Sequence, residues 1–495
     1  MKIRLSSIIL FAAILGAGAY IGFRIVHLPD QFLFVTLLAL FMFYPILRYP
    51  LFGVYLLFII MPFVPFIRRL YYLAYARPAA DPLIIIGDII VSMMVLGLFF
   101  VFREQVQRGI LRSRIIYLVF FYFVYMVLRT FVANELPLGA ALLKFRFYGP
   151  QVLLFFIGIL YAGRETHLKR LWTLTVVIAI GAVLYGLKQS LFGYSESEKI
   201  WFSSIDFTSL FIKGIARPFS FFQSPAAFAD YLQLATIGLI FFTGYGKSTG
   251  KILWVLVPLL WTGVLITSVR SSWIGMALTF FIWFLLVRIR GITQRIVVIA
   301  VIAACFMTFD VLGAVINTGL GVGSIVSSVS STTQADQTIN LLITERANAF
   351  ENPFQEHSIV SRIALWKYII EMSVIPQLAL LGRGIGVLSA DSLYITYLAE
   401  LGYPGVLLIV ALLVLFIQYG FKVIDAGRSK WTVSLAVAVV TMDIVMAIIG
   451  ITGSHMHAFP GDSYFWFWNG VVVGLWTGKL NHDEWKEAYE AAPDA

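Results

Sequence analysis

Basic side chains recur near the ends of apolar segments in this sequence, and several are arginines that could bind a phosphate group. A guanidinium stays charged at any physiological pH and donates paired hydrogen bonds to phosphate oxygens. A lysine or arginine at a helix end can also extend to the lipid headgroups without any ligand, and each residue alone has this simpler interpretation. Together they predict a cavity that binds an anion at one membrane surface. The candidates are Lys144, Arg146, Lys213, Arg217, Arg270, Arg346, Arg362 and Arg383.

Arg270 lies in a short polar connection between two apolar runs. The segment LITSVRSSWIG, from Leu265 to Gly275, is too short to leave the membrane interface. An arginine held there is costly unless it has a partner or faces a polar cavity. A hairpin arginine that reaches the headgroups is the alternative.

Two kinds of group could accept a proton beside such an anion. Asp391 is the first candidate, because a carboxylate with a suitable pKa can act as a general base. His455 and His457 are the second, because imidazole titrates near neutral pH and Asp462 is close enough in sequence to orient one of them. The alternatives stay open, since Asp391 is also a typical helix N-cap and loop histidines are usually inert.

Two shorter patterns occur in the long connection at residues 315–401. In the segment SRIALWKYI, Arg362 and Trp366 fall at helical spacing, which predicts an amphipathic helix on the membrane surface. The following run LGRGIG, residues 381–386, could wrap its backbone amides round an anion, although a plain turn is the simpler prediction.

Three acids, Asp88, Asp230 and Asp443, stand in or beside apolar runs. An acidic side chain within the membrane costs free energy and usually pairs with another polar group. A hydrogen bond between helices is the expected role of Asp443.

The composition predicts that membrane helices hold these residues. Of the 495 residues, 60% are hydrophobic and 13% are charged, and the mean hydropathy is +0.89. Soluble domains carry roughly a quarter charged residues. The single cysteine, Cys305, excludes a disulfide framework. The sequence has neither a histidine motif of metal-binding spacing nor a GxxxxGK[ST] loop, so we expect no metal, no other cofactor and no ATP hydrolysis.

The apolar runs predict an all-α polytopic membrane protein with about fourteen transmembrane helices and a large extracytoplasmic loop that contains short amphipathic helices. The predicted spans are residues 6–26, 31–48, 51–67, 84–102, 115–133, 147–163, 171–193, 226–245, 252–269, 272–288, 295–314, 403–423, 431–452 and 464–479.

Short basic connections orient the chain. Lysine and arginine concentrate in residues 103–114, 163–170, 244–251, 288–295 and 422–430. Because basic loops stay in the cytoplasm, we expect both termini to be cytoplasmic and the long connections to be extracytoplasmic.

The central one of three regions is set apart by its resemblance to a known family. The three regions are N-terminal helices at 1–214, a central region at 215–424 with the long loop 315–401, and C-terminal helices with a short tail at 425–495.

The central region resembles the O-antigen ligase and Wzy-type polysaccharide polymerase superfamily. Arg270 matches the arginine at a helix junction in that family. Arg362 and Trp366 match its R-x3-[L/W] motif, and Gly384 and Gly386 match its G-x-G turn. These motifs occur in the order that the family shows.

Two further features extend the resemblance, which covers roughly residues 215 to 420. Gly402 stands at the family spacing in H-x10-G, and Asp391 occupies the position of the family histidine. Residues 217–231 resemble the family segment that enters an earlier helix.

The resemblance implies glycosyl transfer from an undecaprenyl-diphosphate-linked glycan at the outer leaflet of the bacterial inner membrane. Arg270 and Arg362 would bind the diphosphate and stabilise it as it leaves, and Asp391 would accept the proton of the acceptor sugar, with His455 or His457 as the second choice. The other residues expected at the diphosphate are Arg217, Arg383 and Lys213.

Polymerase and ligase differ in the acceptor, which is a second lipid-linked repeat unit or a lipid A core sugar. We favour the polymerase because Asp391 replaces the histidine and because about fourteen helices exceed the usual ligase count. A chain-length regulator or a flippase is a further expected partner besides the lipid bilayer, and nucleic acid is not. A transporter of the lipid-linked glycan is the alternative of another class, with Asp88, Asp230 and Asp443 as its sites.

Overall fold

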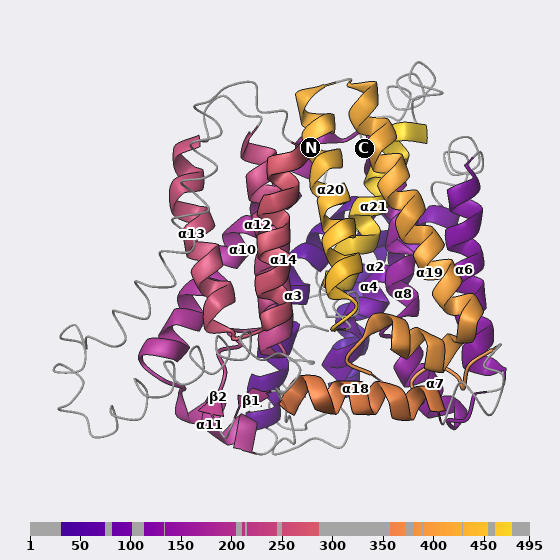
Figure 1. Ribbon diagram of the computed structural model, residues 1–495. Coiled ribbons are helices and arrows are strands. Elements are labelled where there is room, and N and C mark those ends of the chain that lie inside the picture. The colour runs from indigo at the N-terminus through magenta and orange to yellow at the C-terminus, as the bar shows by residue number, and fades with distance from the viewer. Residues whose placement is uncertain are drawn as a thin grey trace, which may run out of the picture.

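The upright helices of Figure 1 form a bundle, with α18 (His357–Ile369), α11 (Glu196–Ser203) and the strand pair at its lower end. The computed structural model describes residues 31–74, 82–100, 113–132, 134–203, 210–212, 215–244, 250–286, 357–371, 381–388, 390–427, 429–453 and 461–477. Within these ranges the chain is almost entirely helical. The exception is one short antiparallel pair of strands, β1 (Phe211–Ile212) and β2 (Ile215–Ala216).

The helices of the bundle follow the apolar runs of the sequence. They are α2 (Gln31–Arg48), α3 (Pro50–Ala74), α4 (Ile86–Phe100), α6 (Arg114–Phe131), α8 (Gly149–Val152), α9 (Leu154–Tyr161), α10 (Glu165–Leu191), α12 (Pro225–Gly244), α13 (Gly250–Ile266), α14 (Arg270–Leu286), α19 (Leu393–Ala426), α20 (Lys430–Ile449) and α21 (Gly461–Thr477). Four short helices complete the described structure: η1 (Pro82–Ile85), α7 (Leu138–Phe145), α11 (Glu196–Ser203) and α18 (His357–Ile369).

The protein is therefore an all-α membrane protein. Six helices of the described residues are long and apolar enough to cross a membrane by length and composition. The predicted spans at 6–26 and 295–314 lie outside the described residues, and each of the other predicted segments overlaps a helix. The larger number of fourteen spans stays a prediction.

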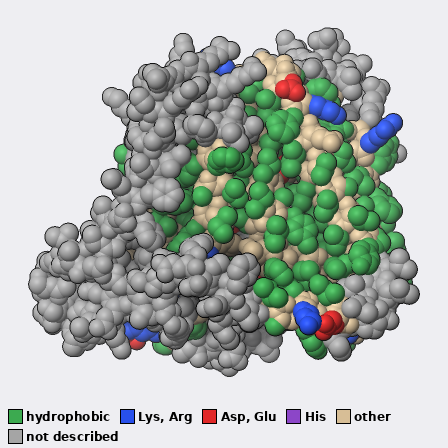
Figure 2. All heavy atoms as spheres, in the orientation of Figure 1, with side chains coloured by type: hydrophobic (Ala, Val, Ile, Leu, Met, Phe, Trp, Pro, Cys, Tyr) green, Lys and Arg blue, Asp and Glu red, His purple; other side chains and the backbone are tan. Residues whose placement is uncertain are grey.

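Apolar side chains cover the outside of the bundle as well as its core. Phe120 and Phe121 of α6 are exposed, whereas Val119 and Tyr122 of the same helix are buried. Figure 2 shows hydrophobic side chains over the middle of the described surface and charged side chains mainly at its two ends. A helix that is apolar on both sides suits one face packed on protein and the other in lipid.

The element α19 consists of two helices that meet in a kink at Gly402. The first begins at Leu393, and the second begins directly after Gly402, where we expected the span from residue 403. Gly402 has φ 70° and ψ −169° at this kink, and Pro404 follows it. The glycine and the proline resemble a helix start in sequence, because a positive φ and a missing N–H also occur between helices.

Described residues in or beside three basic connections lie close together at the upper end of the bundle. The Lys169 ammonium lies 5.6 Å from the ring of Trp431. Near the start of α6, the Ser113 and Tyr419 hydroxyls lie 2.8 Å apart. These contacts bring together described residues that lie in or beside the connections 103–114, 163–170 and 422–430.

Helix α18 runs across the opposite, lower end (Figure 1). The predicted surface helix is thus present, but its apolar residues are not confined to one side. Ile369 is buried with Ala390 and Ala399, whereas Ile363 and Tyr368 are exposed. The lower end also holds the short elements α7, α11, β1 and β2 (Figure 1).

Helices α9 and α21 cross at backbone contact. A Cβ atom on Gly158 would lie 2.1 Å from the carbonyl oxygen of Phe467, and one on Gly470 would lie 2.0 Å from that of Phe155. Neither position can hold a methyl group unless the helices separate. Small residues at such a crossing allow close packing, which drives helix association in lipid.

Replacing Gly470 by alanine should therefore destabilise the protein by about 1–3 kcal/mol, because the added methyl group overpacks the crossing. The measurement is the thermal unfolding midpoint of the purified protein in detergent. Gly181→Ala is the matched control, since nothing lies within 4 Å of a Cβ atom at this exposed position of α10. Equal midpoints for the two variants would contradict the close crossing.

Candidate functional site

The polar segment that leads into α12 lies at the lower end of the bundle. It follows β2 and covers residues 217–224, where the chain has no regular structure. The Arg217 N–H donates to the Leu210 carbonyl oxygen at 2.9 Å. Helix α12 then begins with a proline, and the Ser224 hydroxyl accepts from the Ala227 N–H at 3.2 Å. A serine before an N-terminal proline is a favourable helix start.

Gln189 of α10 holds the centre of this segment. Its side-chain oxygen accepts from the N–H groups of Phe219, at 3.1 Å, and of Ser220, at 2.7 Å. Its side-chain nitrogen lies 3.3 Å from the Ser220 carbonyl oxygen. Ser220 has φ 53°, a left-handed conformation that a non-glycine residue keeps only where its surroundings fix it.

Glu198 of α11 fixes Gln189 in turn. The buried carboxylate accepts from the Gln189 side-chain nitrogen at 2.6 Å and from the Ser195 N–H at 2.8 Å. Lys188 lies 3.5 Å away. Burial acts to raise the pKa of Glu198, but the hydrogen bonds from Ser195 and Gln189 and the charge of Lys188 outweigh it and hold this pKa below its usual range.

Arg69 reaches the same segment from the end of α3. It is 4% exposed and donates to the Ser220 carbonyl oxygen at 3.0 Å. Its guanidinium lies 4.7 Å from the ring centroid of Phe219 and 5.4 Å from those of Phe66 and Trp201. The Nε and Nη1 atoms have no hydrogen-bond partner among the described residues, so ring contacts and one backbone bond hold this cation.

Arg217 and Arg270 share this end of the bundle. Arg270 is the first residue of α14, after a tight turn in which Ser268 has φ 55°. Arg217 precedes α12, which packs against α14. Both arginines are half-buried.

The backbone N–H groups of the glycine turn at 381–386 donate hydrogen bonds within the protein. Gly382, Gly384 and Gly386 all have positive φ values. The Gly384 N–H donates to the Glu400 carbonyl oxygen at 2.9 Å, and the Gly386 N–H donates to the buried Glu400 carboxylate at 2.9 Å. The amides of this turn therefore bind Glu400, through its backbone carbonyl oxygen and its buried carboxyl group beside the kink of α19.

Arg383 is committed to a partner within the protein. Its Nε donates to Glu135 Oε1 at 2.7 Å and its Nη2 donates to Oε2 at 2.5 Å. Hydrogen bonding to Glu135 raises the pKa of Arg383. A bidentate carboxylate occupies the donors that a diphosphate would need. We therefore leave Arg383 out of the candidate site.

Asp391 is exposed and immediately precedes the N-cap of α19. Ser392 occupies the N-cap position and makes no side-chain capping hydrogen bond, so Asp391 is not the N-cap residue. The exposure of Asp391 fits a residue that meets a ligand at this end.

Several predicted site residues cannot be placed. Lys213, His455 and His457 lie outside the described residues. Arg362 lies in α18, whose described backbone crosses this end of the bundle, but its side chain also falls outside the described part.

Each acid in the apolar runs has a protein partner. Asp88 forms an ion pair with Arg146 at 3.2 Å. Asp230 of α12 accepts from the Ser272 hydroxyl of α14 at 3.3 Å. Asp443 of α20 accepts from the Asn469 amide of α21 at 2.8 Å, which confirms the hydrogen bond expected between helices.

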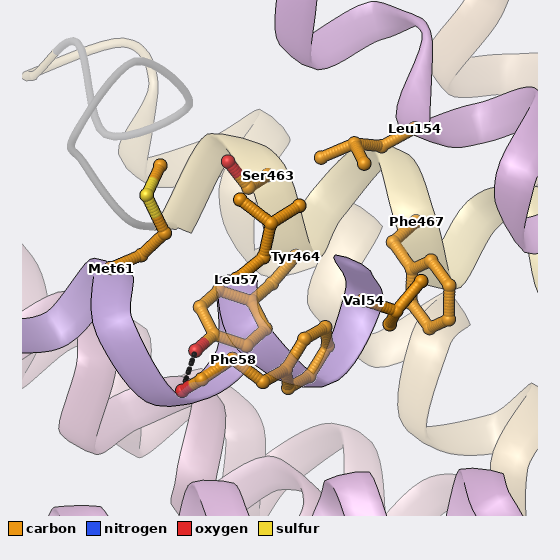
Figure 3. A pocket seen from close by; sticks show the side chains of 8 residues that line it. All are labelled: Val54, Leu57, Phe58, Met61, Leu154, Ser463, Tyr464 and Phe467. Carbon is orange, nitrogen blue, oxygen red and sulfur yellow. Dashed lines mark hydrogen bonds between the residues drawn. The ribbon is translucent and has the colours of Figure 1, made fainter. Parts of the chain in front are cut away.

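A small cavity between α3, α9 and α21 is chemically different from this polar end (Figure 3). Its lining is almost entirely apolar, and Tyr464 turns its hydroxyl away to donate to the Phe58 carbonyl oxygen at 3.3 Å. Such a lining does not suit a phosphate. The described residues also contain no group of three or more histidine, cysteine or acidic side chains that could hold a metal ion.

Sequence reasoning missed Arg69, Gln189 and Glu198. Arg69 resembles any arginine at the end of a span, and Gln189 is one polar residue in a long apolar run. Their shared partner, Ser220, is 151 residues from Arg69. A local pattern cannot reveal such a contact.

No family model matches the chain, and no curated protein matches it.

The pairing of Arg383 predicts non-additive variants. Glu135→Gln and Arg383→Gln should each lower stability by about 1 kcal/mol or less, and the double variant should lose no more than either single one. Thermal midpoints of the four proteins give this coupling. The exposed pair Lys199 and Glu196 within α11 is a matched control with a smaller effect. Fully additive losses would contradict the pairing.

The lowered pKa of Glu198 predicts a dependence on pH. Its stabilising contribution is complete above the ordinary value of 4.5 and is lost as pH falls through the lower value of the folded state. The difference in unfolding midpoint between the wild type and Glu198→Gln should stay constant from about pH 8 to pH 5.5 and shrink below about pH 4.5. A difference that shrinks on going to high pH would contradict this assignment.

Proposed function

We propose that the protein is a membrane glycosyltransferase that polymerises lipid-diphosphate-linked oligosaccharide repeat units into a cell-surface polysaccharide. The observation that supports the proposal is that Arg217, in the segment before α12, and Arg270, at the start of α14, are half-buried beside two helices that pack together. This end lies opposite the meeting point of the basic connections. The ordered resemblance to the ligase and polymerase superfamily supplies the substrate class.

The proposed orientation in the membrane follows from the lysines and arginines of the short basic connections. Loops rich in lysine and arginine stay in the cytoplasm, so the upper end in Figure 1 is the cytoplasmic one. The reaction then takes place at the outer leaflet of the bacterial inner membrane. Both termini are cytoplasmic in this arrangement.

The chemistry needs no nucleotide, because the donor already carries its leaving group. The bond between the anomeric carbon and the diphosphate oxygen breaks, and a bond to the acceptor hydroxyl oxygen forms. Asp391 accepts the proton of that hydroxyl. Arg217, Arg270 and Arg362 bind the diphosphate and stabilise the charge that grows on it.

The acceptor decides between the two closest reactions. A second lipid-linked repeat unit makes the protein a polymerase, and a lipid A core sugar makes it a ligase. The transporter alternative has less support, because Asp230 and Asp443 already hydrogen-bond side chains of neighbouring helices.

The test is a reconstitution of the purified protein in proteoliposomes with the lipid-linked repeat unit alone. We expect a ladder of lengthening glycans on a gel. A product that appears only when lipid A core is added would identify the ligase.

Arg270→Ala and Arg362→Ala should each reduce the polymerisation rate by about 100-fold or more, because each removes a donor to the departing diphosphate. Arg170→Ala is the matched control, since this exposed arginine lies at the opposite end of the bundle. Flipping of the repeat unit, measured in the same vesicles, should not change. Lost flipping in these variants would overturn the enzyme assignment in favour of a transporter.

A further inference from the structure

Arg217 is fixed from both sides along the chain. On one side, the Tyr194 hydroxyl donates to the carbonyl oxygen of Ala216 at 3.1 Å. On the other, Gln189 binds the N–H groups of Phe219 and Ser220. The backbone at Arg217 therefore cannot shift without breaking a buried hydrogen bond.

The two fixing points belong to one network. The Tyr194 ring stacks on Phe219, with centroids 5.8 Å apart and an interplanar angle of 12°. Phe219 also covers the guanidinium of Arg69, which donates to the Ser220 carbonyl oxygen. The Ser220 hydroxyl donates in turn to the Ala182 carbonyl oxygen at 2.8 Å.

The network joins parts of the chain that are distant in sequence. Arg69 comes from α3, Gln189 from α10 and Tyr194 from the connection before α11. Glu198 of α11 holds Gln189 and also accepts from the Tyr185 hydroxyl at 3.0 Å. Because these hydrogen bonds link α3, α10 and α11 to one segment, moving any one of these helices alone would break some of them.

We propose that Arg69, Gln189 and Tyr194 are positioning residues that hold Arg217 in place to bind the diphosphate of the donor. The inference rests on the proposed function. None of the three needs to touch the substrate. Arg69 is nearly fully buried, and its charge lies against aromatic rings, so it acts through the segment that it binds.

Positioning Arg217 before the substrate binds matters for the rate. A side chain that is ordered only on binding costs conformational entropy, and this cost reduces the stabilisation that it gives to the transition state. A small displacement of a group that stabilises the transition state costs roughly 10- to 100-fold in rate. The left-handed Ser220 fits this purpose, since strained backbone persists where the surroundings enforce it.

The test is a double-mutant cycle between Gln189→Met and Arg217→Ala, with kcat and KM measured for the lipid-linked donor in proteoliposomes. We expect Gln189→Met to lower kcat/KM by roughly 10- to 100-fold. In the Arg217→Ala background it should cause no further loss, because the group that it positions is absent.

Tyr194→Phe is the gentler second variant, because it removes the bond to Ala216 and keeps the ring on Phe219. It should lower kcat/KM by several-fold and bind undecaprenyl diphosphate in nanodiscs more weakly than the wild type. Arg69→Lys should also lower kcat/KM, because an ammonium keeps the charge but lacks the planar group that stacks on Phe219 and donates to Ser220.

Ser190→Ala is the matched control. Ser190 follows Gln189 directly and donates to the Gly186 carbonyl oxygen of its own helix. This variant should keep the wild-type kcat/KM. Its unfolding midpoint shows how much stability is lost when one buried hydrogen bond is removed, and Gln189→Met is compared with it.

The outcomes separate the two proposals. A wild type that forms polymer, with additive effects of Gln189→Met and Arg217→Ala, overturns the positioning role and leaves the function intact. A loss of activity in Gln189→Met that simply follows its unfolded fraction also overturns it. A wild type that forms no polymer in the complete reconstitution overturns the function and the positioning role with it.

Discussion

The rest of the structure depends on the need to pair backbone polar groups at the edge of a lipid phase. A helix pairs its own N–H and C=O groups, but the segments at 217–224 and 381–388 do not. Each is bound by an arginine from the end of a bundle helix. Arg69 donates to the Ser220 carbonyl oxygen at 3.0 Å, and Arg129 donates to the Gly382 carbonyl oxygen at 3.0 Å. These cations let irregular chain remain at the end of an apolar bundle.

This role changes how the basic residues near helix ends are interpreted. As a set, they predicted either an anion cavity or contacts with headgroups. Arg69 and Arg129 bind carbonyl oxygens of their own chain, and Arg383 binds Glu135. Arg217 and Arg270, the proposed diphosphate ligands, are half-buried and also have interactions within the protein. Part of the positive charge at this end therefore stabilises the fold itself.

Most helices could be predicted from the sequence, because hydrophobic length alone marks a span. The site was predicted only in part. Spacing placed Arg217 and Arg270 at helix ends on one side, but it could not show that Glu135 holds Arg383, 248 residues away. The span expected from residue 403 begins after the break at Gly402, but the short helix before it, from Leu393, was not among the predicted spans. Long-range pairing and tolerance of a kink depend on tertiary contacts that no local window contains.

The contact between α9 and α21 limits where this protein can change shape. Gly158 and Gly470 bring the two backbones together with no side chain between them, so sliding one helix past the other would collide main-chain atoms. The pair is a fixed axis through the bundle. The proposed reaction needs space for a bulky glycan, and any movement that provides this space must come from elements around this axis. The close crossing thus separates a rigid part of the bundle from the helices that are able to move.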